Sequence, residues 1–294
     1  MTGPRSLPPA LAERARAFAT GRVTPVEPRP AATVVLLRDG AAGLETYLLR
    51  RRSTMAFAAG MHVFPGGGVD PRDVSGSRVG WLGPDVEEWA RRLDTDAAAA
   101  HGFVCAAVRE TFEEAGVLLA TPVETTHRER PAGPTRPTGP DWDADRQALV
   151  DRRIALSELL ARRGLGVRTD LLAPWAHWVT PRFEERRYDT WFFVAALPDG
   201  QEARHVSGEA DRVAWLRPAE AVAAASRGEV ALLPPTWTVL TELAEFDSVA
   251  AVQAAAQRRT IERIMPGWTD DGEVVRVLLP GDPGFPGDDR GRTG

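Results

Sequence analysis

The residues best suited to chemistry gather in one segment, 106–117, which reads AAVRETFEEAGV. On a helix, Glu110 and Glu114 lie four residues apart and Glu113 lies three from Glu110, so the three carboxylates share one edge. Like charges at this spacing repel each other, and a helix that gathers them either faces water or binds a cation. Hard divalent cations such as Mg²⁺ prefer oxygen ligands of this type. The segment therefore predicts a solvated helix face or a metal site.

Two further features bear on this choice. Arg109 lies four residues before Glu113, so the two side chains can pair and the arginine can fix the orientation of that carboxylate. Upstream, Phe64 and Pro65 precede Gly66 and Gly67. Glycine has no Cβ and tolerates positive φ, so this turn lets the backbone approach an anionic group closely. Its carbonyls can also serve as neutral metal ligands, and the combination favours the metal site.

The elements that position these residues can be predicted from the surrounding pattern. Two apolar, β-branched runs at 31–38 and 44–51 flank a short Asp- and Gly-containing connection, which indicates two paired strands. Segment 96–115 is uninterrupted helix-forming sequence, with Asp96 placed as an N-cap and Gly116 placed as a left-handed C-cap. Segment 70–95, with one helix at 84–93, is interpreted as an insertion between the glycine turn and the acidic helix.

The rest of the chain alternates further helices and strands. Helices are predicted at 9–19, 143–163, 218–227 and 235–246. The block 175–197 contains strand-forming sequence, most clearly at 188–194, and a further short strand is predicted at 212–216. Segment 124–142, rich in Pro, Thr, Gly and Arg, is predicted to be a loop. Strands mixed with helices favour α/β layers.

The acidic segment resembles the second half of the Nudix box, the signature of the Nudix hydrolases. Arg109, Glu110, Glu113, Glu114 and Gly116 match its fixed residues, with Thr111 in the place of an aliphatic one. Gly67 matches the opening glycine, and Asp73 stands where the family has Glu. The family pattern then has seven residues before the arginine, whereas here 35 residues, 74–108, intervene. The resemblance therefore implies an insertion of 28 residues inside the box, placed at 74–101.

Three other segments resemble one branch of the Nudix hydrolases. Segments 60–67 (GMHVFPGG), 175–181 (WAHWVTP) and 188–193 (YDTWFF) together are similar to the peroxisomal coenzyme A diphosphatase branch and its bacterial relatives, over about 31–282. Arg52 and Gly60 fit the arginine-containing signature of other coenzyme A enzymes, but its second arginine position is Ala56.

The resemblance implies a fold and a division of the chain. The fold is an α/β/α sandwich around a mixed sheet, with one Nudix domain at 31–282. An N-terminal arm at 1–30, a helical C-terminal extension at 218–265 and a flexible tail at 283–294 complete the chain. A homodimer is the oligomer we expect, since dimers are the commonest assemblies.

The implied reaction is hydrolysis of a phosphoanhydride in a nucleoside diphosphate linked to another group, dependent on Mg²⁺ or Mn²⁺. Coenzyme A or acyl-coenzyme A would give 3′,5′-ADP and (acyl-)4′-phosphopantetheine. One alternative is a diphosphatase for another nucleotide, such as ADP-ribose or NADH. Another is a non-catalytic Nudix module that senses a ligand or binds a protein, although such modules normally have damaged glutamates.

The resemblance also implies roles for individual residues. Glu110, Glu113 and Glu114 would hold the metal with Gly67, and Arg109 completes the catalytic set. A further carboxylate from a loop is expected to join them; Glu209 is the candidate, with Glu184 and Glu185 as rivals and an exposed loop acid as the alternative interpretation. The substrate-binding candidates are Arg50, Arg52, His62, Gly66 and Gly67.

Each of these candidates also has an ordinary structural interpretation. Arg50, Arg51 and Arg52 could reach phosphates or form a solvated strand end, and His62 could donate to the diphosphate or pack at a loop edge. Cys105 is interpreted as a small buried side chain without a catalytic role. The large aromatic residues could stack on adenine or belong to the core; they are Trp175, Trp178, Trp191 and Trp237.

Composition limits the class of protein. The chain has 294 residues, 43% hydrophobic and 26% charged, as expected of a folded globular protein. All 36 basic residues are arginine, a codon signature of a GC-rich, bacterial source. A net charge of −5 disfavours broad nucleic-acid binding. One cysteine and no apolar run of about 18 residues predict a cytoplasmic protein without an internal disulfide or a membrane span.

Overall fold

A mixed β-sheet forms the centre of the molecule. The computed structural model describes residues 6–52, 59–75, 79–123, 135–206, 208 and 210–285. In this part of the chain the sheet has eight strands, in the order β10-β7-β8-β1-β2-β3, with β4 paired to β1 and β9 paired to β2. The strands are β1 (Arg29–Gly40), β2 (Gly43–Arg51), β3 (His62–Val63), β4 (Gly66–Gly68), β7 (Leu172–Val179), β8 (Tyr188–Ala196), β9 (Ala210–Leu216) and β10 (Arg263–Ile264).

The pairing of β1 places the glycine turn at the middle of the sheet. β1 runs parallel to β8 and antiparallel to both β2 and β4. It pairs with β4 through Ala31–Thr33 and with β2 through its other end, from Leu37 onward. Gly66 and Gly67 therefore lie directly beside the central strand.

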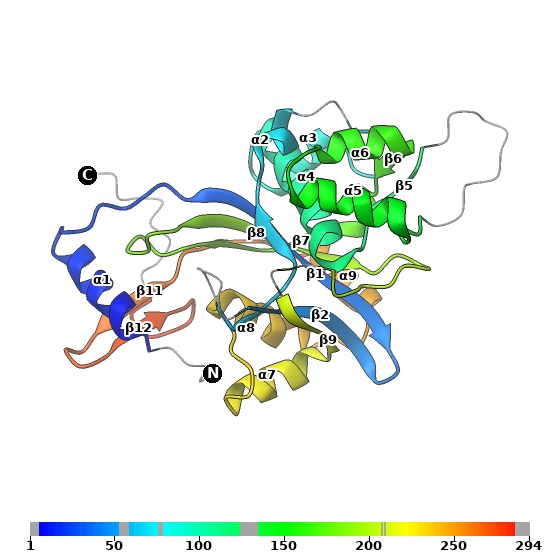
Figure 1. The fold of residues 1–294 in the computed structure, drawn as a ribbon. Helices are drawn as coiled ribbons and strands as arrows, with labels where there is room; N and C mark the ends of the chain where they lie inside the picture. The colour runs from blue at the N-terminus through cyan, green and yellow to red at the C-terminus, as the bar shows by residue number, and fades with distance from the viewer. Residues whose placement is uncertain are drawn as a thin grey trace.

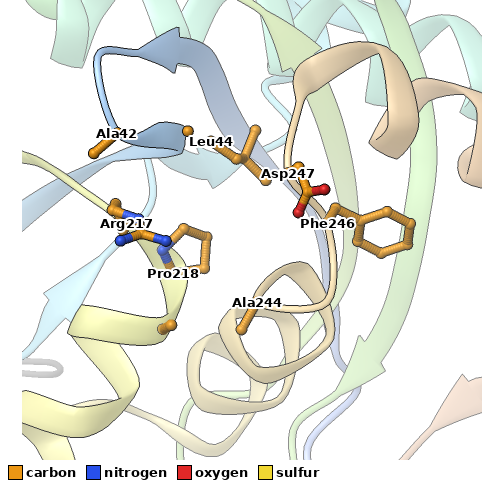
Figure 2. Close-up of a pocket in the computed structure, with 9 residues that line it drawn as sticks. Ala42, Leu44, Arg217, Pro218, Ala244, Phe246 and Asp247 are labelled. Atoms are coloured by element: carbon orange, nitrogen blue, oxygen red, sulfur yellow. The ribbon is translucent and has the colours of Figure 1, made fainter.

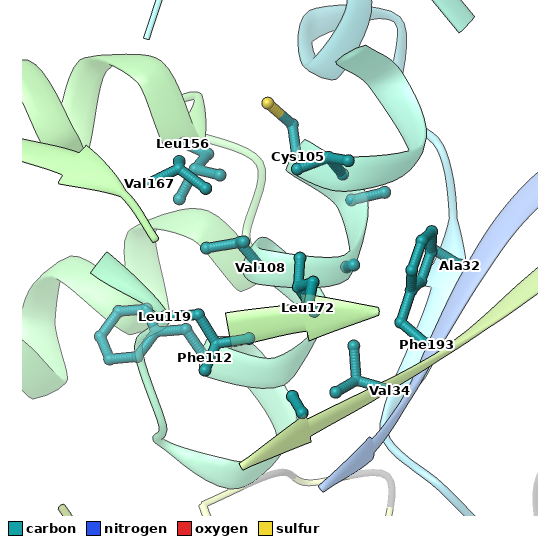
Figure 3. Packing of buried hydrophobic residues seen from close by; sticks show 14 of the residues in the cluster. Ala32, Val34, Cys105, Val108, Phe112, Leu119, Leu156, Val167, Leu172 and Phe193 are labelled. Atoms are coloured by element: carbon teal, nitrogen blue, oxygen red, sulfur yellow. The ribbon is translucent and has the colours of Figure 1, made fainter. Parts of the chain in front are cut away.

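One face of the sheet carries the acidic helix. The helices on this face are α2 (Pro71–Ser75), α3 (Val86–Arg92), α4 (Ala97–Ala115), α5 (Pro140–Val150) and α6 (Leu156–Arg163), and they lie together above the sheet in Figure 1. The short paired strands β5 (Ala120–Pro122) and β6 (Leu165–Val167) and a 3₁₀ turn at Thr169–Leu171 accompany them. Val108 and Phe112 of α4 meet Val34 and Phe193 of the sheet in one apolar cluster (Figure 3).

The opposite face is covered by α7 (Pro218–Ser226), α8 (Pro234–Leu243) and α9 (Val249–Ala256). Val35, Leu37 and Leu48, which alternate with the residues of the first face, pack against Leu240 and Val252. The two apolar clusters thus make an α/β/α sandwich, which confirms the predicted fold class.

A third, small cluster joins the two ends of the described chain. Helix α1 (Pro9–Ala19) packs against the hairpin of β11 (Gly267–Asp270) and β12 (Val275–Leu278) through Ala12, Ala15 and Val275. Arg16 holds Asp270 with both Nε and Nη2, at 2.8 and 3.0 Å. In Figure 1 these elements lie to one side of the sheet.

Most predicted elements are confirmed, and helix α4 is confirmed with its caps. The Asp96 carboxylate accepts from the Ala99 N–H at 2.8 Å, and Gly116 ends the helix at φ 68°. The predicted helix at 143–163 is wrong, because the chain forms α5 and α6 with a turn between them. Arg152 adopts φ 55° in that turn, and its N–H donates to the Leu149 carbonyl. The sequence pattern did not predict α2, α9 or the β11–β12 hairpin.

No helix in the described segments is long and apolar enough to cross a membrane.

Candidate active site

Arg109 connects the charged residues of the site. Its guanidinium is buried and donates to the Glu110 carboxylate at 2.7 Å and to the Glu113 carboxylate at 3.3 Å. It also donates to the Gly68 carbonyl at 2.8 Å. Burial acts to lower the pKa of Arg109, but Glu110, Asp73 and Glu113 raise it well above its ordinary value. The predicted pairing of Arg109 with Glu113 is confirmed, and the arginine fixes Glu110 as well.

Asp73 closes the charge network from the other side. Its side chain is buried on α2 and accepts from Arg109 Nε at 3.1 and 3.2 Å and from Nη2 at 2.9 Å. The Asp73 carboxylate also accepts from the Asp70 N–H at 2.9 Å. The structure therefore brings the residue matched to the first acid of the Nudix box next to the arginine of its second half, although an insertion separates them.

Gly67 lies under the Glu110 carboxylate. A Cβ on Gly67 would overlap the three carboxyl atoms of Glu110, and a Cβ on Gly66 would lie 2.6 Å from the Ala32 carbonyl oxygen. The predicted close approach of this backbone to an anionic group is seen at the Glu110 carboxylate, and neither glycine is among the described residues with positive φ. These glycines are required because α4 and β1 approach the β4 backbone closely.

Glu114 is fixed from the same strand. Its Oε2 accepts from the Gly66 N–H at 2.9 Å, and its side chain is buried near Tyr47 of β2. Burial raises the pKa of Tyr47, and the nearby Glu114 charge raises it further. The Tyr47 hydroxyl donates to the Arg204 carbonyl at 2.9 Å, which joins the site to the segment before β9. The sequence pattern predicted no role for Tyr47, since it reads only as a buried strand residue.

The ionisation of Glu113 is disfavoured by its surroundings. Burial, together with the negative charge of Glu110, raises the pKa of Glu113 to about 7, against the opposing effect of Arg109. The acids at this end of α4 thus carry more negative charge than Arg109 balances. A divalent cation would supply the missing positive charge.

The donor set fits such a cation chemically. Three carboxylates from one helix edge and the adjacent backbone of Gly67 are hard oxygen ligands of the type that Mg²⁺ and Mn²⁺ take. Within the described residues, no group of three or more His, Cys, Asp or Glu side chains is arranged closely enough to hold a metal ion. Arg109 contacts both Glu110 and Glu113, two of the proposed metal ligands.

Two of the substrate-binding candidates lie away from these carboxylates. Arg50 pairs in register with His62 of β3, and both alternate with Leu49 and Val63, which pack on the α4 side of the sheet. Arg50 and His62 therefore point to the opposite face. Arg50 binds Asp211 through two bonds of 2.6 and 2.7 Å. Burial lowers the pKa of His62, and the positive charge of Arg50 lowers it further.

The other candidates are placed as follows. Arg52 Nε donates to the Ala210 carbonyl at 3.4 Å, beside the end of β2. Glu209 lies outside the described residues. Glu185 pairs with Arg14 of α1 at 2.9 Å. Burial raises the pKa of Glu184, and Arg14 opposes this effect. Both of these rivals to Glu209 thus lie beside α1.

The core interpretation holds for the large aromatic residues. Trp175, Trp178 and Trp191 are buried. Trp237 of α8 is partly buried and packs against the apolar cluster between the sheet and helices α7–α9. Cys105 is buried as predicted, and burial raises the pKa of its thiol.

A cavity of about 200 Å³ lies elsewhere, between the β1–β2 turn and the start of α7. Figure 2 shows Arg217 and Asp247 on its two sides, and no residue of the Nudix box lines it.

The comparisons with known proteins agree with this geometry. The family model of the NUDT19 Nudix domain matches residues 84–243, more than half of the chain. The acyl-coenzyme A diphosphatase NUDT19 of Gallus gallus is 28% identical over 87% of this chain and 80% of its own length. That of Homo sapiens is 29% identical over 82% and 72%, respectively. The crystal structure of a Nudix hydrolase from Alicyclobacillus acidocaldarius has a TM-score of 0.60 at 28% identity, covering 78% of this chain and 96% of its own.

The sandwich fold, the contacts of Asp73, Glu110 and Glu113 with Arg109 and the matching family model lead to one assignment. The chain belongs to the NUDT19 Nudix domain family and is a Nudix hydrolase.

Proposed function

We propose that this Nudix hydrolase cleaves the phosphoanhydride of coenzyme A or acyl-coenzyme A, giving 3′,5′-ADP and (acyl-)4′-phosphopantetheine. The names of the two NUDT19 relatives support this substrate class. The observation that carries the reaction type is the charge network, in which Glu110, Glu113 and Asp73 all contact Arg109.

The acids, Arg109 and the β4 backbone have separate roles in this proposal. Glu110, Glu113 and Glu114 would hold Mg²⁺ or Mn²⁺ with help from Gly67. When bound, the cation neutralises diphosphate charge and lowers the pKa of a coordinated water. Arg109 orients Glu110 and Glu113, and the Gly66 N–H orients Glu114. The bare β4 backbone leaves room for the Glu110 carboxylate, so the acids are placed before substrate arrives.

The test is a substrate panel. Purified protein is incubated with coenzyme A, an acyl-coenzyme A, ADP-ribose and NADH, each with Mg²⁺, with Mn²⁺ or with EDTA, and products are separated by chromatography. We expect 3′,5′-ADP from the coenzyme A compounds when a divalent cation is present. EDTA and the Glu113→Gln substitution should each abolish its formation.

The same panel tests the alternative. A higher kcat/KM for ADP-ribose or NADH than for either coenzyme A compound would overturn the proposed substrate while keeping the Nudix chemistry. Cleavage that persists in EDTA and in Glu113→Gln would overturn the proposed metal dependence.

A further inference from the structure

A buried guanidinium lies beside the Nudix acids without a carboxylate partner in the described residues. Arg146 of α5 is 9% exposed, and its Nε is buried with no hydrogen-bond partner in the described part of the chain. Among the described residues it makes one long hydrogen bond, in which Nη1 donates to the Glu113 carbonyl at 3.4 Å. Arginine is almost never buried unless its charge is paired, so this arrangement calls for an anion.

A second guanidinium lies near the first. Arg204, in the segment before β9, also has a buried Nε without a hydrogen-bond partner among the described residues. Its Nη2 contacts the Pro137 carbonyl at 3.3 Å and the Asp143 carboxylate at 3.7 Å. Burial lowers the pKa of Arg146; the nearby charge of Arg204 also lowers it, while Asp143 and Glu113 oppose this. Asp143 lies one turn before Arg146 on α5, so Arg204 meets the same helix that carries Arg146.

The end of α4 explains part of this arrangement. The Glu113 carbonyl belongs to the last turn of α4, and a cation at a helix C-terminus is stabilised by the helix dipole. However, that role uses one of the five N–H donors of Arg146 and leaves Nε buried and unpaired. A structural cap alone does not require a second arginine whose Nε is buried in the same way.

We propose that Arg146 and Arg204 bind a phosphate group of the nucleotide substrate next to the Nudix acids. Guanidinium groups match phosphate oxygens through paired N–H donors, and a phosphate would satisfy both buried Nε atoms. Arg146 contacts the main chain of Glu113, one of the acids that the proposed function assigns to the metal. This site rests on the proposed function, because that function supplies a substrate with a 3′-phosphate as well as a diphosphate.

The experiment compares coenzyme A with dephospho-coenzyme A, which differ only in the 3′-phosphate. The variants are Arg146→Met, Arg146→Lys and, as a control, Arg153→Met, since Arg153 is an exposed arginine paired with Asp151 just after α5. Thermal unfolding of each variant accompanies the kinetics. We expect Arg146→Met to raise KM about 10- to 100-fold for coenzyme A. Arg146→Lys should recover part of this loss, and Arg153→Met should behave as wild type.

The two substrates identify which phosphate is bound. A loss confined to coenzyme A assigns the pair to the 3′-phosphate, and an equal loss on both substrates assigns it to the diphosphate. Unchanged KM values in a folded Arg146→Met protein would overturn the proposal. So would a loss of thermal stability with wild-type KM, which is the result that a helix cap predicts.

A binding measurement separates this proposal from the proposed function. Calorimetric titration with 3′,5′-ADP and with inorganic pyrophosphate needs no turnover. If the wild type cleaves neither coenzyme A compound, the proposed function fails. The phosphate site then stands if Arg146→Met weakens binding of either probe at least tenfold, and it falls if the variant binds both as wild type does or if wild type binds neither.

Discussion

Asp73 and Arg109 form a buried ion pair although they are 36 positions apart in the sequence. The chain between them leaves the site through α2, forms α3 and returns as the N-terminal half of α4. Val108 and Phe112 pack the C-terminal half of α4 against the sheet, which fixes the position of the acids there. The ion pair then joins the two halves of the Nudix box.

Removing the Asp73 charge should damage stability and activity together. Asp73→Asn removes one of the three carboxylates that contact the buried Arg109 guanidinium, and losing such a hydrogen-bonded charged partner costs about 1.5–3 kcal/mol while Glu110 and Glu113 remain. Urea unfolding measures this loss. Since Arg109 also orients Glu110 and Glu113, we expect kcat to fall about 10- to 100-fold.

The matched control for Asp73 is Asp170→Asn. Asp170 pairs with Arg168 at 2.7 Å, but the two side chains are 41% and 35% exposed to solvent, respectively. Its loss should cost at most about 1 kcal/mol and leave kcat unchanged. Equal unfolding midpoints for Asp73→Asn and wild type would contradict the anchoring role of Asp73.

Gly67→Ala tests the close approach of Glu110 to β4. The new Cβ would overlap the Glu110 carboxylate and displace it, and misplacement of a catalytic group by about 1 Å can cost about 100-fold in rate. At Gly68 the nearest atom to a Cβ is the Pro30 carbonyl oxygen at 3.9 Å, so Gly68→Ala is the control. We expect kcat to fall only in Gly67→Ala. A similar kcat in the two variants would show that Glu110 tolerates the displacement.

Much of the fold could be predicted because its signals are local. Continuous apolar runs define β1 and β2, and Asp96 and Gly116 mark the two ends of α4. The break between α5 and α6 could not be predicted, because no Gly or Pro marks it and Arg152 adopts a left-handed conformation there. The short helix α2 could not be predicted either, since its Asp73 is held by tertiary contact with Arg109.

Of the site, only the residues that belong to the Nudix motif could be predicted. The Nudix pattern identified Arg109 and the three glutamates, and spacing alone paired Arg109 with Glu113. Arg146 had no local signal, because its proximity to Glu113 depends on how α5 packs on α4. Arg50 and His62 were selected by residue type, and strand alternation then placed them on the far face.

Arg50→Ala tests that placement. Arg50 is exposed and bound to Asp211, on the side of the sheet away from Glu110. We therefore expect KM and kcat to stay within about threefold of wild type, a difference of less than about 0.7 kcal/mol in transition-state stabilisation. Steady-state kinetics with coenzyme A measures both. A tenfold rise in KM would show that Arg50 reaches the substrate from the sheet edge.

Glu113→Gln should make the protein more stable near neutral pH while removing its activity. The folded-state pKa of Glu113 is about 7, above its ordinary value of 4.5, because burial and Glu110 disfavour the charge. The neutral carboxyl therefore contributes stability that is complete below about pH 4.5 and is lost as pH rises through 7. The full difference is of order 3 kcal/mol in EDTA.

Thermal and urea unfolding between pH 4 and 8 in EDTA measure this dependence. Glu113→Gln should flatten the wild-type decline and exceed wild-type stability at pH 8. Added Mg²⁺ or Mn²⁺ should raise the stability of wild type at pH 8 and have little effect on Glu113→Gln, since a cation that binds only the folded state stabilises it more as its affinity rises. Parallel pH profiles for the two proteins would show that Glu113 ionises normally, and equal metal shifts would show that its carboxylate is not a ligand.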